Sequence, residues 1–263
     1  MSQAQHSLET ATAALQAQPK WTRLPIRTRP HRNPLAENDD DHPDCPEEMR
    51  NRTRQWYPTS TKDVEFLDVG CAFGGMLFSL APLFPDTLML GLEIRPKVVD
   101  YAQKKTIAYR GGAGGDGVTH HFGNLWFEPL NVMKFGSNCF EKGQLSKIFF
   151  CYPDPHWKRK NIRRRIISPG LVQEYAFWLR PGGLIYTVSD VEGLETWMIS
   201  CLDACPLFRR LSDEEISSQC SNHDDIVKIV IDSSEDAQRT ARKGLKKNYA
   251  VHVRIEPNLA ESV

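Results

Sequence analysis

Asp154 stands between two prolines, directly after an apolar segment and directly before a dense run of cations. The segment FFCYPDPHWKRKNIRRR covers residues 149–165, and six of the eight positions 158–165 are Lys or Arg. Because proline restricts its own backbone and that of the preceding residue, Pro153 and Pro155 largely preset the direction of the acid. A carboxylate held in this way can recognise a nucleobase, and clustered cations bind a phosphate backbone. The segment therefore predicts a site where a base meets a fixed acid.

The residues that follow Asp154 extend this predicted nucleic-acid site. Trp157 can stack on a base, and His156 can contact a base or a phosphate. Plainer interpretations stay open: an acid that caps a turn, rings that only pack, and cations that form a solvated helix face or a nuclear-import signal. The residues predicted to bind nucleic acid are His156, Trp157, Lys158, Arg159, Lys160, Arg163, Arg164 and Arg165.

A second group of residues is typical of a nucleoside pocket. The turn DVGCAFGG, residues 68–75, follows an apolar segment, and its small residues Gly70 and Ala72 allow a ligand to approach the backbone. Glu93 ends the next apolar segment, 23 residues after Gly70, where a carboxylate can bind both hydroxyls of a ribose. Asn131 follows a third such segment and can meet an adenine edge. The turn also matches a dinucleotide fingerprint, so a hydride carrier and a methyl donor both remain open here.

These residues follow predicted strands that alternate with predicted helices. Strands are expected at 64–69, 88–94, 124–129, 147–151 and 183–189, and helices at about 75–84, 96–110, 168–179 and 192–204. Weaker strands are expected near 225–231 and 248–254, with a basic helix at 237–247 between them and a glycine-rich loop at 111–117. Continuous apolar strands joined by helices predict a parallel sheet covered on both faces. Ligands bind such sheets at the carboxyl ends of the strands, where Glu93, Asn131 and Asp154 all lie.

Composition limits the class of protein further. With 263 residues, 40% hydrophobic and 25% charged, the chain suits one large α/β domain with appendages. The formal net charge is zero, so affinity for a polyanion must come from local segregation of charge. The seven cysteines show no paired metal-ligand spacing, so we expect reduced, packed thiols and no metal. No apolar run approaches the roughly 18 residues of a membrane span, and the N-terminus lacks a secretory signal, so we expect an intracellular protein without membrane contact.

The chain divides into three parts by composition and hydrophobic pattern. Residues 1–60 are polar and interrupted by prolines, which indicates a flexible leader and an extended arm that drapes over a domain. Residues 61–256 carry the periodic apolar segments and form that domain, and residues 257–263 form a tail.

Several segments closely resemble the tRNA (guanine-N7)-methyltransferase family in its eukaryotic form. They are GLEIRPKV, GQLSKIFFCYPDPHWKRK, RRRIISPGLVQEYAFWLRPGGLIYTVSDV and PLFRRLSDEE, and the resemblance covers roughly residues 25–256. It implies a class I S-adenosylmethionine-dependent methyltransferase fold, which is Rossmann-like with a mostly parallel seven-stranded sheet. It also implies methyl transfer to N7 of a guanosine in the tRNA variable loop (position 46), with S-adenosyl-L-homocysteine as the product. The implied partners are tRNA and a non-catalytic WD-repeat propeller subunit, and the implied location is the nucleus, with the cytoplasm second.

The resemblance also implies roles for individual residues. Asp154 matches the proposed active-site acid of the family. Ala72 replaces a glycine, which costs on the order of 1 kcal/mol if the turn needs positive φ. The SSED segment also fits a capping box that pairs Ser233 with Asp236. The residues implied to bind the methyl donor are Gly70, Glu93, Ile94, Arg95, Asn131, Val132, Cys151, Ser234, Glu235 and Asp236.

The chemistry of guanine N7 fixes the predicted role of the acid. N7 carries a lone pair and no proton, so methyl transfer to it needs no general base, and the enzyme has only to hold the reactants in place. We therefore predict that Asp154 accepts hydrogen bonds from the N1–H and N2–H edge of guanine. The alternatives are an amino-methyltransferase acting on another base, a NAD-dependent oxidoreductase, and a catalytically silent tRNA-binding or scaffold subunit. The order Pro-Asp-Pro-His and the joint presence of acid and nucleoside pocket argue against them.

Overall fold

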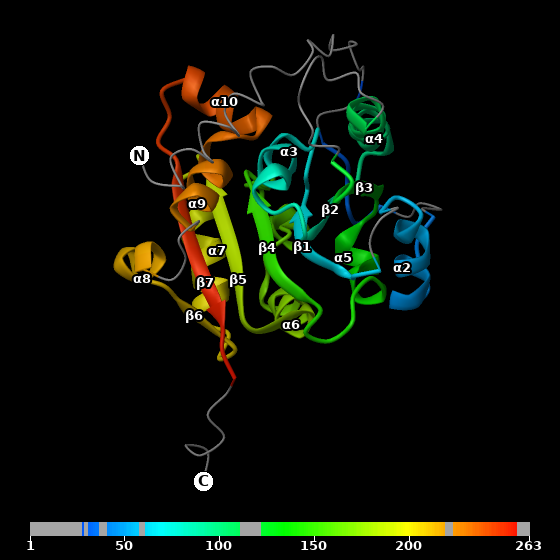
Figure 1. Cartoon of the computed structure of the whole chain (residues 1–263). Coiled ribbons are helices and arrows are strands. Elements are labelled where there is room, and N and C mark those ends of the chain that lie inside the picture. Colours follow the sequence, from blue (N-terminus) through cyan, green and yellow to red (C-terminus); the bar gives the residue numbers. More distant parts are fainter. Residues whose placement is uncertain are drawn as a thin grey trace.

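A twisted sheet of seven strands forms the centre of the molecule (Figure 1). The computed structural model describes residues 28, 31–36, 41–57, 61–110, 122–218 and 223–256. The strand order is β3-β2-β1-β4-β5-β7-β6; β1 to β5 run parallel, and β7 is antiparallel to β5 and to β6. The strands are β1 (Val64–Val69), β2 (Leu88–Glu93), β3 (Leu125–Pro129), β4 (Leu145–Cys151), β5 (Leu179–Ser189), β6 (Phe208–Arg210) and β7 (Asn248–Arg254).

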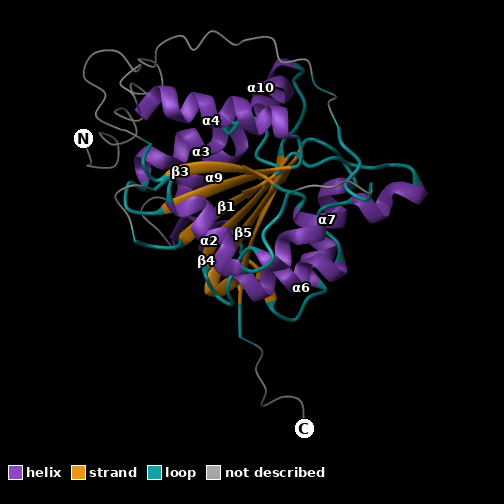
Figure 2. Cartoon of the chain, turned by 90° about the vertical axis from the view of Figure 1, so that its right-hand side faces the viewer, coloured by secondary structure: helices purple, strands orange, loops and turns teal. Residues whose placement is uncertain are grey.

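Helices cover both faces of this sheet (Figure 2). One face carries α3 (Gly75–Leu80), α4 (Pro96–Arg110) and α9 (His223–Asp232), and the other carries α5 (Val132–Phe135), α6 (Pro169–Trp178) and α7 (Leu194–Asp203). Successive side chains of a strand point to opposite faces. Phe149 therefore packs in the core under α3 and α9, while the neighbouring Phe150 packs in the core under α6 and α7. The predicted parallel sheet covered on both faces is confirmed.

Helix α6 shows how local sequence sets these boundaries. Pro169 occupies the first turn, where its missing N–H is no loss, and the Ser168 hydroxyl accepts a hydrogen bond from the Leu171 amide at 3.5 Å. Leu171, Val172 and Tyr175 then bury one side of the helix. The sequence predicted this helix, and α4 also has the bounds that the sequence predicted.

The region expected to be an extended arm contains a helix, α2 (Pro46–Arg54). A short helix is favoured here by a proline at its start. The charges also complement the helix dipole, since Glu47 and Glu48 lie in the first turn and Arg52 and Arg54 in the last. Its buried Met49 and Thr53 face the core. The sequence analysis missed it because only two buried side chains mark its apolar side.

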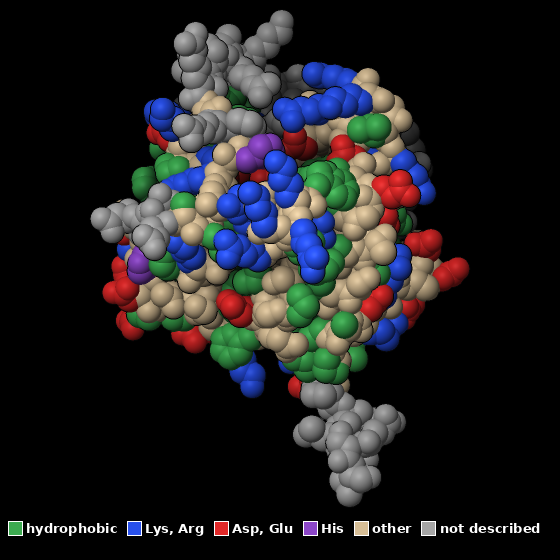
Figure 3. Space-filling model, turned by 180° about the vertical axis from the view of Figure 1, so that it is seen from behind, with side chains coloured by type: hydrophobic (Ala, Val, Ile, Leu, Met, Phe, Trp, Pro, Cys, Tyr) green, Lys and Arg blue, Asp and Glu red, His purple; other side chains and the backbone are tan. Residues whose placement is uncertain are grey.

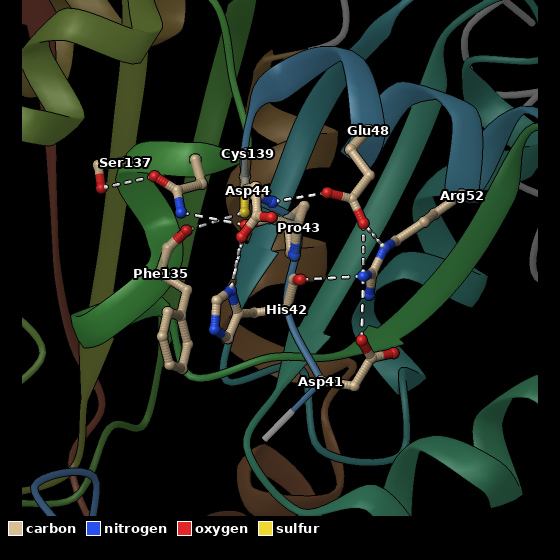
Figure 4. A network of polar contacts seen from close by, with 10 residues as sticks. Asp41, His42, Pro43, Asp44, Glu48, Arg52, Phe135, Ser137 and Cys139 are labelled. Atoms are coloured by element: carbon tan, nitrogen blue, oxygen red, sulfur yellow. Dashed lines mark hydrogen bonds and ion pairs between the residues drawn. The ribbon is translucent and has the colours of Figure 1, made fainter. Parts of the chain in front are cut away.

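A polar network fixes α2 and the chain before it to the domain (Figure 4). The Arg52 guanidinium donates hydrogen bonds to the Glu48 carboxylate at 2.7 Å, to Asp41 at 3.0 Å and to the His42 carbonyl at 2.9 Å. The ring of His42 stacks on Phe135, with 3.8 Å between ring centroids. These contacts order residues 41–54 against α5.

Two further predictions for the C-terminal region need correction. The strand expected near 225–231 is wrong, because these residues form α9, whose Ile226, Val227 and Val230 lie buried on one side. β-branched residues suggested a strand, but burial against the sheet stabilises a helix. The seventh strand is instead the short β6.

The basic helix expected at 237–247 is α10 (Glu235–Arg242), which is shorter at its carboxyl end. Its N-cap is Ser234, whose hydroxyl accepts from the Ala237 amide at 3.0 Å, and not Ser233 as the capping box predicted. One short helix, α8 (Asp213–Ser218), precedes α9.

Other expectations concern cysteines, metals and membranes. The described cysteines are free thiols, and Cys71, Cys139, Cys201 and Cys205 are buried, as predicted. Within the described ranges, no cluster of three or more His, Cys, Asp or Glu side chains could hold a metal ion. None of the described helices has the length and hydropathy of a membrane span. The predicted loop 111–117, most of the leader and the tail 257–263 lie outside the described residues.

Candidate functional site

The carboxyl ends of the parallel strands bring the predicted nucleoside-pocket residues together. β1 and β2 pair in register from Phe66 opposite Met89 onwards, so Gly70, directly after β1, lies beside Glu93, the last residue of β2. The Gly70 amide donates to the Leu92 carbonyl at 2.8 Å. Glu93 in turn lies opposite Pro129, the last residue of β3, and Asn131 follows that strand two residues later. Residues from three parts of the chain therefore share one edge of the sheet.

The glycine turn after β1 leaves room above its backbone. Gly70 has φ +78°, and a Cβ added there would meet no atom within 4 Å. Gly74 has φ +80°, and its Cβ would lie 2.3 Å from the Phe127 ring. Ala72 has φ +47°, so the strained backbone expected at this substitution is present. Gly74 is thus needed for packing, whereas Gly70 borders open space in which a ligand can lie.

Glu93 is a buried acceptor at this edge, with 4% of its surface exposed. Its carboxylate accepts hydrogen bonds from the Ala72 amide at 3.2 Å and from the Arg95 amide, Nε and Nη2 at 3.0 Å each. Burial disfavours the charged form of Arg95, but the bonds to Glu93 and the nearby carboxylates of Asp154 and Asp236 hold the pKa of Arg95 above its ordinary value. Arg95 is therefore bonded to Glu93 and lies within the electrostatic influence of the predicted catalytic acid.

Part of the N-terminal arm lies across the pocket. The Arg32 guanidinium donates to the Ile94 carbonyl at 2.7 Å, and the Asn131 side-chain amide donates to the Pro34 carbonyl at 2.7 Å. The Nδ1 atom of His31 lies 2.7 Å from Oδ1 of Asp154. Residues 31–36 thus contact the predicted donor-binding residues and the predicted acid at the same time.

Asp154 lies in a backbone loop that is strained on both sides. Tyr152 has φ +53° and His156 has φ +47°, and each non-glycine residue in this region costs about 1 kcal/mol or more. The Asp154 side chain is 39% exposed, at the carboxyl edge of β4. The acid is therefore partly accessible to solvent just beyond the end of β4.

Two side chains that the sequence analysis did not recognise as supports hold this loop. The Tyr152 hydroxyl donates to the Ile231 carbonyl of α9 at 2.7 Å, and Nε of Arg165 donates to the Pro155 carbonyl at 2.9 Å. Arg165 is 7% exposed, and its guanidinium lies over the ring of Trp197 at 4.9 Å. A buried guanidinium bonded to the loop could not be distinguished in the sequence from its exposed neighbours.

The remaining cations of the basic segment are mostly exposed. Lys158 precedes a 3-10 helix (Arg159–Arg164), and Lys158, Arg159, Lys160 and Arg163 face solvent, while Arg164 is half-buried. Trp157 is 59% exposed. Figure 3 shows the face of the molecule on which Lys and Arg side chains gather beside a histidine. The basic segment thus presents exposed cations and one exposed aromatic ring directly after the Asp154 loop in the chain.

Two titratable groups of the site are held neutral. Partial burial, followed by the field of Arg164, lowers the pKa of His156, although Asp154 opposes this shift. His156 is therefore a neutral hydrogen-bonding group at pH 7. Burial raises the pKa of the thiol of Cys151, a predicted donor-binding residue, well above its ordinary value, so Cys151 is a protonated thiol rather than a nucleophile.

The segment predicted to cover the donor forms the start of α10. The Ser234 hydroxyl caps the helix, and Asp236 pairs with Arg239 at 3.2 Å. The Thr240 hydroxyl donates to the Asp190 carboxylate at 2.7 Å, which ties α10 to the end of β5 near the carboxyl edge (Figure 1). The side chain of Glu235 lies outside the described part of the structure. Asp190 lies in a segment that carries the family resemblance, but neither Asp190 nor Thr240 was predicted as a site residue.

Comparison with known proteins identifies the family. A family described as "Putative methyltransferase" matches residues 62–250. The tRNA (guanine-N(7)-)-methyltransferase of Caenorhabditis briggsae is 44% identical over 232 residues, which cover 88% of this chain and 87% of that protein. The enzyme of the same name from Arabidopsis thaliana is 44% identical over 247 residues, 90% of this chain and 94% of that protein. The Schizosaccharomyces pombe enzyme is 43% identical over 245 residues, with 90% and 87% covered.

A class I methyltransferase is defined by four features of this structure: the sheet order, the antiparallel β7, the glycine turn after β1 and the acid at the end of β2. Within that class, the chain belongs to the tRNA (guanine-N7)-methyltransferase family. The predicted fold class and the predicted family are both confirmed. The assignment of individual site residues stays a prediction.

Proposed function

We propose that this protein transfers the methyl group of S-adenosylmethionine to N7 of a guanosine in the tRNA variable loop (position 46). The observation that carries the proposal is the position of Asp154, which is partly exposed just beyond the carboxyl end of β4 and directly precedes the exposed cations in the chain. Membership of the family and the names of its relatives support the choice of base and of tRNA.

The residues at the pocket suit the nucleoside part of the donor. The space above Gly70 admits a ligand against the backbone. Glu93 offers the acceptor atoms that two ribose hydroxyls need, and these atoms are at present bonded to Arg95. When bound, the donor supplies an electrophilic methyl group. Arg95 then exchanges Glu93 for other acceptors, and the carboxylates of Asp154 and Asp236 already contribute to its electrostatic surroundings.

The chain orients the purine and does not need to abstract a proton. Guanine N7 has a free lone pair, so catalysis depends on holding the base in position, an effect that can supply several kcal/mol of the barrier. Asp154 accepts the N1–H and N2–H edge and balances the positive charge of the methylated purine. Neutral His156 adds a hydrogen bond, and Trp157 stacks on a base. The exposed Lys158, Arg159, Lys160 and Arg163 bind phosphates.

The proposal includes a partner and a location. The protein forms a heterodimer with a non-catalytic WD-repeat propeller and resides in the nucleus, with the cytoplasm second. The resemblance of the sequence to the eukaryotic family supports both statements, and the basic segment 158–165 also suits a nuclear-import signal. Co-purification of the tagged full chain, and microscopy of the tagged chain in cells, test these two statements separately.

One assay tests the reaction itself. The full chain, alone and co-expressed with a WD-repeat subunit, is incubated with bulk tRNA and a labelled methyl donor, and the tRNA is digested to nucleosides. We expect the label in 7-methylguanosine, and we expect it to disappear when position 46 of a tRNA transcript is changed from G to A. Label in another nucleoside would support an amino-methyltransferase, and unlabelled tRNA would support a silent scaffold subunit.

A further inference from the structure

Arg165 differs from the other cations of the basic segment because its charge is turned inwards. It is 7% exposed, whereas Lys158, Arg159, Lys160 and Arg163 are exposed. A phosphate in solution cannot reach a guanidinium that lies beneath the surface. The position of Arg165 within a run of cations therefore does not indicate that it binds phosphate.

The contacts of Arg165 lead to the catalytic loop instead. Its Nε donates to the Pro155 carbonyl at 2.9 Å, and its guanidinium lies over the Trp197 ring of α7 at 4.9 Å. Trp197 is fixed in turn, because its Nε1 donates to the Ile167 carbonyl at 2.8 Å and its amide donates to the Gly193 carbonyl at 3.1 Å. Arg165 thus connects the residue directly after Asp154 to a helix anchored in the core.

The loop that Arg165 holds has a conformation that needs support. Tyr152 and His156 both have positive φ, and such residues persist only when the surrounding structure determines their conformation. The first is held by the bond from the Tyr152 hydroxyl to Ile231, and the second follows the Pro155 carbonyl that Arg165 holds. The peptide segment that carries Asp154 is therefore tied at both ends, to α9 and to α7.

We propose that Arg165 is a positioning residue, which fixes the Pro155 carbonyl and through it the direction of the Asp154 carboxylate, and that it does not bind tRNA. This inference rests on the proposed function, because it assigns Arg165 a role in orienting the guanine at that site. The guanidinium suits this role because its planar group stacks on the Trp197 ring while one N–H donates, and a lysine ammonium cannot do both in this geometry.

The test separates rate from tRNA affinity in purified full-length variants. We expect Arg165→Gln and Arg165→Lys to lower kcat at saturating tRNA and donor by about 10- to 100-fold, because small errors of position at a reacting centre have effects of this size. The tRNA Kd and the donor Kd should stay within about 2-fold of the wild type, since a buried positioning residue contacts neither ligand. Arg165→Lys keeps the charge, so its loss of rate would show that geometry matters.

Arg163→Gln serves as the contrast within the same segment. Arg163 is exposed, so this variant should weaken tRNA binding and reduce the slope of log K against log salt by about one. Tyr152→Phe removes the other tie with little effect on packing, and should reproduce the fall in kcat with unchanged tRNA Kd. If Arg165→Gln fails to fold in a thermal melt, Arg165→Lys and Tyr152→Phe decide the question.

The outcomes distinguish this inference from the proposed function. A wild-type protein that makes no 7-methylguanosine refutes the proposed function and the inference with it. An active wild type, combined with Arg165 variants that keep kcat and lose tRNA affinity as Arg163→Gln does, refutes the inference alone. Full kcat in Arg165→Lys also refutes it.

Discussion

Nδ1 of His31 lies 2.7 Å from Oδ1 of Asp154, so the N-terminal arm touches the acid on which the proposed reaction depends. The two side chains are 64% and 39% exposed, so solvent screens their interaction. Exposed pairs of this kind contribute at most about 1 kcal/mol. The contact is therefore weak enough for guanine to displace.

His31→Gln tests how much this contact matters. Because the contact contributes at most about 1 kcal/mol, we expect kcat/KM for tRNA to change by less than about 5-fold in either direction. Steady-state kinetics with tRNA as the varied substrate measure the change. A loss of 100-fold would mean that His31 acts on the guanine itself.

Asp154→Asn tests the role of the acid. Asparagine keeps the size of the side chain and loses the charge and one of the two acceptor atoms, so we expect the single-turnover rate to fall about 100-fold. Donor affinity, measured by calorimetry, should stay within about 2-fold, because in the proposed site Asp154 contacts the guanine and not the donor. A wild-type rate that falls below a midpoint at about pH 6–7, with the dependence lost in the variant, would instead indicate a general base.

Gly70→Ala and Gly74→Ala form a matched pair. Both glycines have positive φ, so alanine costs about 1–2 kcal/mol of folding stability at either position. Only Gly74→Ala also places a Cβ 2.3 Å from Phe127, so we expect it to lower the melting temperature far more than Gly70→Ala. Gly70→Ala should keep a folded domain and lose donor affinity, because its methyl group enters the open space above the turn. Equal melting temperatures for the two variants would contradict this division.

The exposed cations at the end of α10 should add to the tRNA surface. Arg239 pairs with Asp236, and Lys247 with Asp232 at 2.7 Å, whereas Arg242, Lys243 and Lys246 face solvent. We expect the double variant Arg242→Glu, Lys243→Glu to weaken tRNA binding and to reduce the slope of log K against log salt by about two. Arg239→Gln, which removes a paired cation, is the control and should have a smaller effect. An unchanged slope in the double variant would exclude α10 from the interface.

Folding stability should fall in mild acid because of His252. This side chain is 0% exposed, and its Nε2 lies 2.9 Å from the Asp203 carboxylate. Burial lowers the pKa of His252 below 6.5, although Asp203 opposes the shift. Below about pH 6.5 the unfolded chain binds a proton that the folded chain does not, so the stability present above that pH is lost as the pH falls.

Urea titrations at about pH 7.5 and pH 5.5 measure the His252 effect. His252→Gln should reduce the difference between the two pH values, whereas Asp203→Asn should enlarge it, because the carboxylate is the group that favours the protonated ring. A pH dependence that His252→Gln leaves unchanged would assign it to other groups.

Most strands, and the acid that follows β4, could be predicted from local pattern. The apolar run 147–151 and the two prolines around Asp154 predicted both β4 and an acid at its carboxyl end, because burial and proline geometry act over a few residues. The same local reasoning failed for α9, where β-branched residues suggested a strand. It also failed for α2, which buries only Met49 and Thr53 and is followed by Trp56, whose ring stacks on the distant Trp126 at 3.9 Å.

The sequence by itself determined the alternation of elements, the family, and the set of side chains that could do the chemistry, because these follow from short-range periodicity and from motifs. Only the tertiary structure decided how those side chains are used. Arg165 and Arg163 stand two positions apart in one basic run, yet one lies over Trp197 and holds the Pro155 carbonyl while the other faces solvent. Asp154 is paired with a histidine from the arm, and the Asn131 side-chain amide donates to the Pro34 carbonyl. These pairings depend on packing between elements that are remote in the chain, and no local pattern encodes them.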